Sequence, residues 1–150
     1  MKKQSFSVSL FILPLTILIA CFQNVSGGPK PPADPSLTGT FWQLSHAREV
    51  TYKPAKGVHK VYITLDENNK VSGFLGCNNL AGSYDVSGGK ASIKFQAAST
   101  RMICPGEAMK IEDALNAALS AAAQYHIQGN TLTLMNEHGT VVADFIAGQK

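Results

Sequence analysis

The sequence has 150 residues, enough for one domain with a sizeable hydrophobic core. Its 13 basic and 10 acidic residues give a formal net charge of +3, without a run of basic residues and with two arginines, Arg48 and Arg101. This composition lacks the basic patch that nucleic-acid binding requires, so we expect no nucleic-acid partner.

The N-terminus has the layout of a secretory signal peptide. Lys2 and Lys3 precede an apolar stretch over residues 6–19, and a cysteine, Cys21, follows it. The pattern resembles the bacterial lipobox, in which the cysteine is acylated before the signal is removed. We therefore expect residues 1–20 to be a lipoprotein signal peptide and Cys21 to be the lipidated first residue. Without the two lysines, 11 basic residues remain against 10 acidic ones.

Two other interpretations of this N-terminus remain open. A transmembrane helix needs roughly 20 apolar residues, whereas this stretch is shorter and contains Pro14. An ordinary cleaved signal followed by a chance cysteine is the second alternative. Under the lipoprotein interpretation, the protein is anchored in the bacterial cell envelope. Phe22 follows the cysteine where an aspartate would favour the inner membrane, so we expect the outer membrane, with the domain facing the periplasm.

Residues 21–36 contain four prolines and two glycines and predict a semi-extended tether. A folded domain is expected over residues 37–150. Two cysteines lie within it, Cys77 and Cys104. In an exported protein they most simply form a disulfide. The alternative is two separate buried thiols.

Short apolar runs separated by turn residues predict strands along most of this domain. The expected strands cover residues 41–44, 59–66, 71–75, 82–86, 91–95, 125–128, 131–135 and 140–146. One helix is expected to begin near Pro105, because apolar residues then recur at helical spacing from Ile111 to Ala122. Strands, one helix and then a β-meander indicate an α+β domain with a largely antiparallel, curled sheet.

Several separated motifs resemble those of the META domain, or HslJ-like, family. They are Trp42-Gln43-Leu44, Gly76-Cys77-Asn78, Gly82-Ser83-Tyr84 and the segment from Ser99 to Cys104. One departure is Asn79, where relatives often carry arginine. The resemblance implies a half-open antiparallel barrel with a helix packed across it, and cysteines close enough to bond. It also implies roles in envelope maintenance and stress response, with similarity to pilotins, lipoproteins that chaperone secretin subunits.

The motif residues have a structural and a functional interpretation. In the first, Gly73, Gly76 and Gly82 allow turns and bulges, and Asn78 bonds the backbone of its own loop. In the second, four residues form an exposed binding surface. These are Asn78, Asn79, Tyr84 and Arg101.

Enzymatic interpretations find little support in the sequence. Cys77 as a nucleophile would need an activating histidine, and none of the four histidines lies in a motif that indicates activation. The cysteine spacing does not fit a thiol oxidoreductase, and there is no metal-ligand spacing or phosphate loop. We expect no cofactor and no metal. A cysteine-dependent enzyme remains the alternative to a non-catalytic protein.

The sequence therefore predicts a monomeric, non-catalytic lipoprotein at the periplasmic face of the membrane. One hypothesis is a binding module, in which the helix and curled sheet enclose an apolar groove. Its partner would be an envelope protein, a hydrophobic peptide or an acyl chain, as for a pilotin-like chaperone. The other hypothesis is a stress-response protein of the envelope that acts without a single defined ligand.

Overall fold

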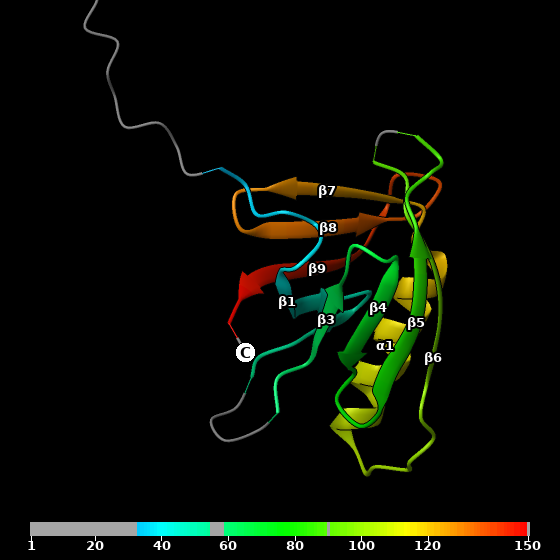
Figure 1. Cartoon of the computed structure of the whole chain (residues 1–150). Coiled ribbons are helices and arrows are strands. Elements are labelled where there is room, and N and C mark those ends of the chain that lie inside the picture. The colour runs from blue at the N-terminus through cyan, green and yellow to red at the C-terminus, as the bar shows by residue number, and fades with distance from the viewer. Residues whose placement is uncertain (1–32, 55–58, 90, 150) are drawn as a thin grey trace, which may run out of the picture. The chain divides into compact units, whose positions relative to one another are not determined.

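The computed structural model describes residues 33–54, 59–89 and 91–149, which contain nine strands and one helix (Figure 1). The strands are β1 (Phe41–Ala47), β2 (Val50–Thr51), β3 (Tyr62–Leu65), β4 (Lys70–Phe74), β5 (Asn79–Asp85), β6 (Lys94–Ser99), β7 (Gln124–Gln128), β8 (Thr131–Met135) and β9 (Val141–Gly148). The helix α1 (Glu107–Ala121) connects β6 to β7.

All strand pairs are antiparallel, in the order β6-β5-β4-β3-β1-β9-β8-β7, with β2 paired to β1. The register shifts in β1 between Leu44 and His46, and in β8 between Leu134 and Met135. Such irregularities bend a sheet and increase its twist. The long sheet therefore curls, as its order of elements predicts.

The two ends of the curled sheet meet at one point. Ser92, just before β6, forms an isolated antiparallel bridge with Gln124 at the start of β7. On either side, the Tyr125 N–H donates to the Ala91 carbonyl at 2.8 Å, and the Ile93 N–H donates to the Ala123 carbonyl at 3.0 Å. Beyond this contact β6 has no second strand partner in the described chain, so the barrel is half open.

The helix packs across the sheet and completes the core. Ile111, Leu115, Ala118 and Leu119 are buried on its inner face, as the helical spacing predicts. The largest fully buried side chains of the sheet come from both of its halves; they are Trp42, Leu44, Ile63, Leu65, Leu132, Leu134 and Phe145. The α+β class, the curled sheet and the single crossing helix are thus confirmed.

Several element bounds differ from those expected. β5 begins at Asn79 and β6 ends at Ser99, so their hairpin extends further from its turn than the expected pair over 82–86 and 91–95. Ala91, expected at the start of the strand over 91–95, is exposed with φ 63° and precedes β6. The helix starts at Glu107, after Gly106 (φ 69°), and not at Pro105. The short strand β2 was not expected.

The expected signal peptide, Cys21 and most of the tether lie outside the described residues. The chain already contacts the domain at Asp34, whose carboxylate accepts a hydrogen bond from the Gly129 N–H at 2.9 Å. The Ser36 carbonyl accepts one from the Thr40 hydroxyl at 2.7 Å. Specific contacts therefore begin slightly before Leu37.

Candidate functional site

The Gly-Cys-Asn loop connects β4 to β5 and lies against the start of α1. Gly76 adopts φ 112°, a conformation that side chains disfavour. A Cβ atom there would lie 3.3 Å from the Ala108 carbonyl oxygen. Next to it, Cys77 forms a disulfide with Cys104, and their Cα atoms are 5.9 Å apart. The bond ties this loop to the segment that leads into the helix.

Asn78 is almost fully buried and bonds two segments outside its own loop. Its side-chain oxygen accepts hydrogen bonds from the Met102 N–H at 2.7 Å and the Thr100 hydroxyl at 2.8 Å. Its side-chain nitrogen donates to the Met102 carbonyl at 3.0 Å. The expected turn, in which Asn78 bonds its own loop, is therefore wrong: this side chain holds the segment before Cys104.

Glu112 is the residue that sequence reasoning missed. Its carboxylate is buried, and accepts hydrogen bonds from the Asn78 backbone N–H at 3.0 Å, the Asn78 side-chain amide at 3.0 and 3.1 Å and the Ser99 hydroxyl at 3.2 Å. The sequence does contain an indication that Glu112 is buried, because it precedes Leu115 and Leu119 by three and seven positions. This spacing places it beside the apolar stripe of α1.

The four residues expected to form an exposed surface are divided between surface and interior. Asn78 is 1% exposed and Tyr84 is 4% exposed, so neither is a surface group in this structure. Asn79 and Arg101 are exposed. Tyr84 lies at an inward position of β5, where alternation directs side chains into the core, and Asn78 lies in the loop just before that strand.

Tyr84 stabilises the turn between β3 and β4. Its hydroxyl donates to the Asp66 carbonyl at 2.7 Å, and its backbone N–H donates to the Asn69 carbonyl at 2.9 Å. The Asp66 carboxylate in turn accepts from the Lys70 N–H at 2.8 Å. Burial raises the pKa of Tyr84 above its ordinary value, and the nearby Asp66 charge adds to the rise. Tyr84 is thus a structural residue.

A mainly apolar groove of about 310 Å³ lies between the first turns of α1 and the start of β3. Its walls are Val61, Gly76, Ala108 and Ile111, and polar residues at its edge are Tyr52, Lys53, His59 and Glu107. The groove depends on the absence of a side chain at Gly76, because a Cβ there would lie 3.6 Å from Val61 and 3.7 Å from Ile111. Its volume is at the lower limit of ligand pockets, about 300 Å³.

The edge of this groove is held in place by Tyr52. The Tyr52 hydroxyl accepts a hydrogen bond from the Val61 N–H at 3.2 Å and donates to the His59 carbonyl at 3.4 Å. The His59 ring packs edge-on against Phe74, with ring centroids 5.9 Å apart. The structure therefore holds Val61, Tyr52 and His59 of this groove in place before a ligand binds.

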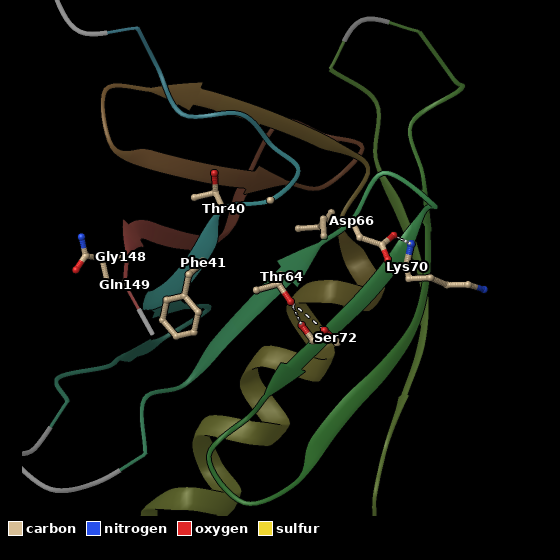
Figure 2. Close-up of a pocket in the computed structure, with 10 residues that line it drawn as sticks. Thr40, Phe41, Thr64, Asp66, Lys70, Ser72, Gly148 and Gln149 are labelled. Carbon is tan, nitrogen blue, oxygen red and sulfur yellow. Dashed lines mark hydrogen bonds between the residues drawn. The ribbon is translucent and has the colours of Figure 1, made fainter.

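A second, more polar cleft of about 660 Å³ lies on the outer face of β1, β3 and β4 (Figure 2). Several of its polar side chains bond to the protein itself. The hydroxyls of Thr64 and Ser72 share a hydrogen bond of 2.9 Å, the Thr40 hydroxyl donates to Ser36, and the Asp66 carboxylate accepts from its own turn. Because these groups hold strands and turns together, the apolar groove is the better candidate for a ligand.

Within the described ranges, no group of three or more His, Cys, Asp and Glu side chains is arranged to hold a metal ion. In the same part of the chain, no helix combines the length and apolar character needed to cross a bilayer.

A family model of the META domain matches residues 35–148. The chain belongs to the META domain family. The resemblance found in the sequence motifs is confirmed, and this META protein has the half-open barrel that the resemblance implied. No curated protein matches the sequence.

Solved structures support the same fold. An NMR structure of a protein from Burkholderia xenovorans shares 25% identity with this chain at a TM-score of 0.59, covering 81% of this chain and 99% of that one. A crystal structure of a DUF4847 family protein from Bacteroides vulgatus ATCC 8482 shares 14% identity at a TM-score of 0.55, covering 76% and 96%. The second likeness concerns the fold alone.

Proposed function

We propose that this META protein is a non-catalytic, lipid-anchored protein of the bacterial cell envelope that binds a hydrophobic group. The observation that carries the binding role is the apolar groove between α1 and β3. Burial of a methylene group stabilises a complex by about 0.8 kcal/mol, so a small apolar pocket favours an acyl chain or a large apolar side chain of a peptide. This is the kind of ligand that a pilotin-like chaperone would take.

The disulfide supports a non-catalytic role. A cysteine nucleophile must be a free thiolate, whereas the sulfur of Cys77 is bonded to that of Cys104. Cys77 is also buried, at 3% exposure. The network of Asn78 and Glu112 beside it connects a loop, a strand end and a helix. Its polar groups serve the fold and do not converge on an open site.

Binding is tested with dodecanoate added to the full chain, followed by NMR of the side-chain methyl groups. We expect saturable shifts at Val61, Ala108 and Ile111. Ala108→Phe should fill the groove and abolish these shifts. Ala117→Phe is the matched control, because Ala117 is exposed on the same helix, and it should leave binding intact. Equal binding by both variants, or no saturable shift in the wild type, would contradict the proposal.

The anchor is tested separately by labelling cells with an alkyne analogue of palmitate. The wild-type chain should take up the label and fractionate with the outer membrane. Cys21→Ala should remain unlabelled and should no longer fractionate with the outer membrane. A labelled Cys21→Ala chain, or an unlabelled wild-type chain, would argue against lipidation at this position.

A further inference from the structure

The half-open barrel leaves one edge of β6 without a partner strand. β6 is the last strand in the sheet order and pairs with β5 alone. Figure 1 shows β6 at the right-hand margin of the domain, beside β5. Ser92 bridges Gln124 at the start of β7. The residues just before Gln124, which would have to pair with β6, belong to the C-terminal end of α1 and the link that follows it, and are not a strand. The open edge therefore covers Lys94–Ser99.

The register identifies which backbone groups face this open edge. The Thr100 N–H donates to the Asn79 carbonyl at 3.0 Å, and Ser99 is paired with Leu80. In an antiparallel ladder, alternate residues bond to the neighbouring strand. Phe95, Ala97 and Ser99 therefore direct their N–H and C=O groups away from β5. No backbone partner for these groups is found within the described residues.

Helix α1 lies beside this strand: Phe95 and Ala97 line a small gap together with Asn116 and Ser120 of α1, and the Ser99 hydroxyl bonds Glu112. The sequence of β6 itself carries few of the features that usually protect an exposed strand. Edge strands are commonly shielded by charged side chains, proline or bulges. In β6 the charge is confined to the first residue, Lys94, and the remaining sequence is Phe-Gln-Ala-Ala-Ser. The side chains of Ala97 and Ala98 are small and exposed, so another backbone can approach closely. On β7, at the other end of the sheet, the Tyr125 N–H already bonds to Ala91.

A groove of mixed polarity flanks the start of this edge, and two exposed apolar side chains follow its end. At its start, a groove of about 590 Å³ lies between β6, the end of α1 and the turn between β8 and β9, lined by residues 94–96, 120–123 and 136–138. Past its end, Met102 and Ile103 are 58% and 95% exposed. The backbone of Met102 is fixed by Asn78, so these apolar side chains are presented on an anchored segment.

We propose that the β6 edge binds an extended, uncharged peptide segment of a partner protein as an additional strand. A row of alternating donors and acceptors is complementary to another strand, because a helix bonds its own backbone groups. The chain's own tether is a poor occupant, since residues 22–36 contain four prolines and proline lacks the N–H donor. The lining residues of the groove at the start of this edge differ from those of the apolar groove of the proposed function, and the two grooves lie at opposite ends of α1.

The test uses the full chain with Cys21→Ala and a capped peptide of alternating threonine and valine, about eight residues long to span the edge. Amide hydrogen exchange is measured by NMR. In the free protein, the amides of Phe95, Ala97 and Ser99 should exchange fast, and those of Gln96 and Ala98 slowly. The peptide should slow the first three by about tenfold or more. A peptide N-methylated at alternate residues should have no effect.

Ala97→Pro removes one outward donor without touching the bonds to β5. It should weaken peptide binding by about tenfold, whereas Ala97→Ser keeps the N–H and should bind normally. Three results would overturn the proposal: protection of the three amides in the free protein, equal binding of the N-methylated peptide, or protection that rises with protein concentration alone. The last would mean that the edge pairs with a second copy. The N-methylated peptide decides the question even if Ala97→Pro does not fold.

Discussion

At the scale of single residues, the most consequential feature is the buried carboxylate of Glu112. Burying a charged group is unfavourable unless hydrogen bonds compensate it. Here the donors come from Asn78 and Ser99, two residues separated in sequence from the helix. No basic side chain within the described ranges forms an ion pair with it. The position of α1 relative to the Gly-Cys-Asn loop therefore depends on a few neutral donors.

Glu112→Gln should lower the free energy of unfolding by about 1–3 kcal/mol. The neutral amide replaces a carboxylate, so the hydrogen bonds from Asn78 lose their charge assistance and Ser99 must turn its hydroxyl to accept from the glutamine nitrogen. Urea unfolding measures this as a lower midpoint at constant slope. Asp113→Asn, an exposed change on the same helix, should stay within about 0.5 kcal/mol of the wild type. Equal effects of the two changes would contradict the assigned role of Glu112.

Tyr84 should make stability fall at alkaline pH. Burial raises its pKa in the folded state, so its contribution to stability is complete below the ordinary value, about 10. That contribution is lost as pH rises through the folded value, because the unfolded chain releases its proton first. Tyr84→Phe should lose about 1 kcal/mol at neutral pH with its hydrogen bond to Asp66. Unfolding measured from about pH 8 to pH 11 should then show a shallower alkaline decline than the wild type.

At the scale of elements, two glycines within strands allow close approach of their neighbours. A Cβ atom at Gly73 would lie 2.2 Å from the Tyr62 carbonyl oxygen, and one at Gly82 would lie 2.4 Å from the Cα of Ala97. Real Cβ atoms do not approach backbone so closely. Both glycines are thus needed for strand contact, and not for the turns or bulges expected from the sequence.

Gly82→Ala should destabilise the domain by about 1–3 kcal/mol, the usual effect of overpacking. Because the clash is with β6, the amides of that strand should lose protection from hydrogen exchange before those of β3. Ala81→Ser changes the exposed neighbouring position and serves as the control. If Gly82→Ala unfolded no more easily than this control, the close β5–β6 contact would be wrong.

The sequence predicted those elements whose patterning is local. Alternation identified β3, and helical spacing identified the buried face of α1. The Gly129-Asn130 pair predicted the β7–β8 turn, where Gln128 pairs with Thr131. These features depend on neighbouring residues, so they can be recognised in one chain without knowledge of tertiary contacts.

The parts that could not be predicted depend on contacts between distant residues. From the sequence alone, Asn78 resembles a turn residue. Its actual partner is the carboxylate of Glu112, which is 34 positions away and cannot be recognised from neighbouring residues. The groove depends on Gly76 lying against Ala108, which sequence spacing does not reveal. The ends of β5 and β6 were misplaced because Gly82 resembles a turn residue, whereas its strand role follows from the approach of Ala97.

At the scale of the whole molecule, the three cysteines have two expected roles: Cys21 carries the lipid anchor, and Cys77 and Cys104 form a disulfide. The bond between Cys77 and Cys104 closes a loop with a sequence separation of 27. The chain-entropy model gives a stabilisation of roughly 3–4 kcal/mol for such a loop. This is a large fraction of the stability of a typical domain. The bridge also fixes the segment that presents Met102 and Ile103, whereas Cys21 would hold the domain at the membrane.

The most direct test of this account is the intact mass of the protein purified from the envelope, measured before and after reduction. We predict a chain that begins at Cys21, carries the mass of its acyl groups and gains two hydrogen atoms on reduction. Alkylation before reduction should add nothing. A chain with two free thiols at Cys77 and Cys104 would contradict the disulfide and would favour the alternative of a cysteine-dependent enzyme with Cys77 as nucleophile. An unmodified Cys21 would contradict the anchored envelope protein.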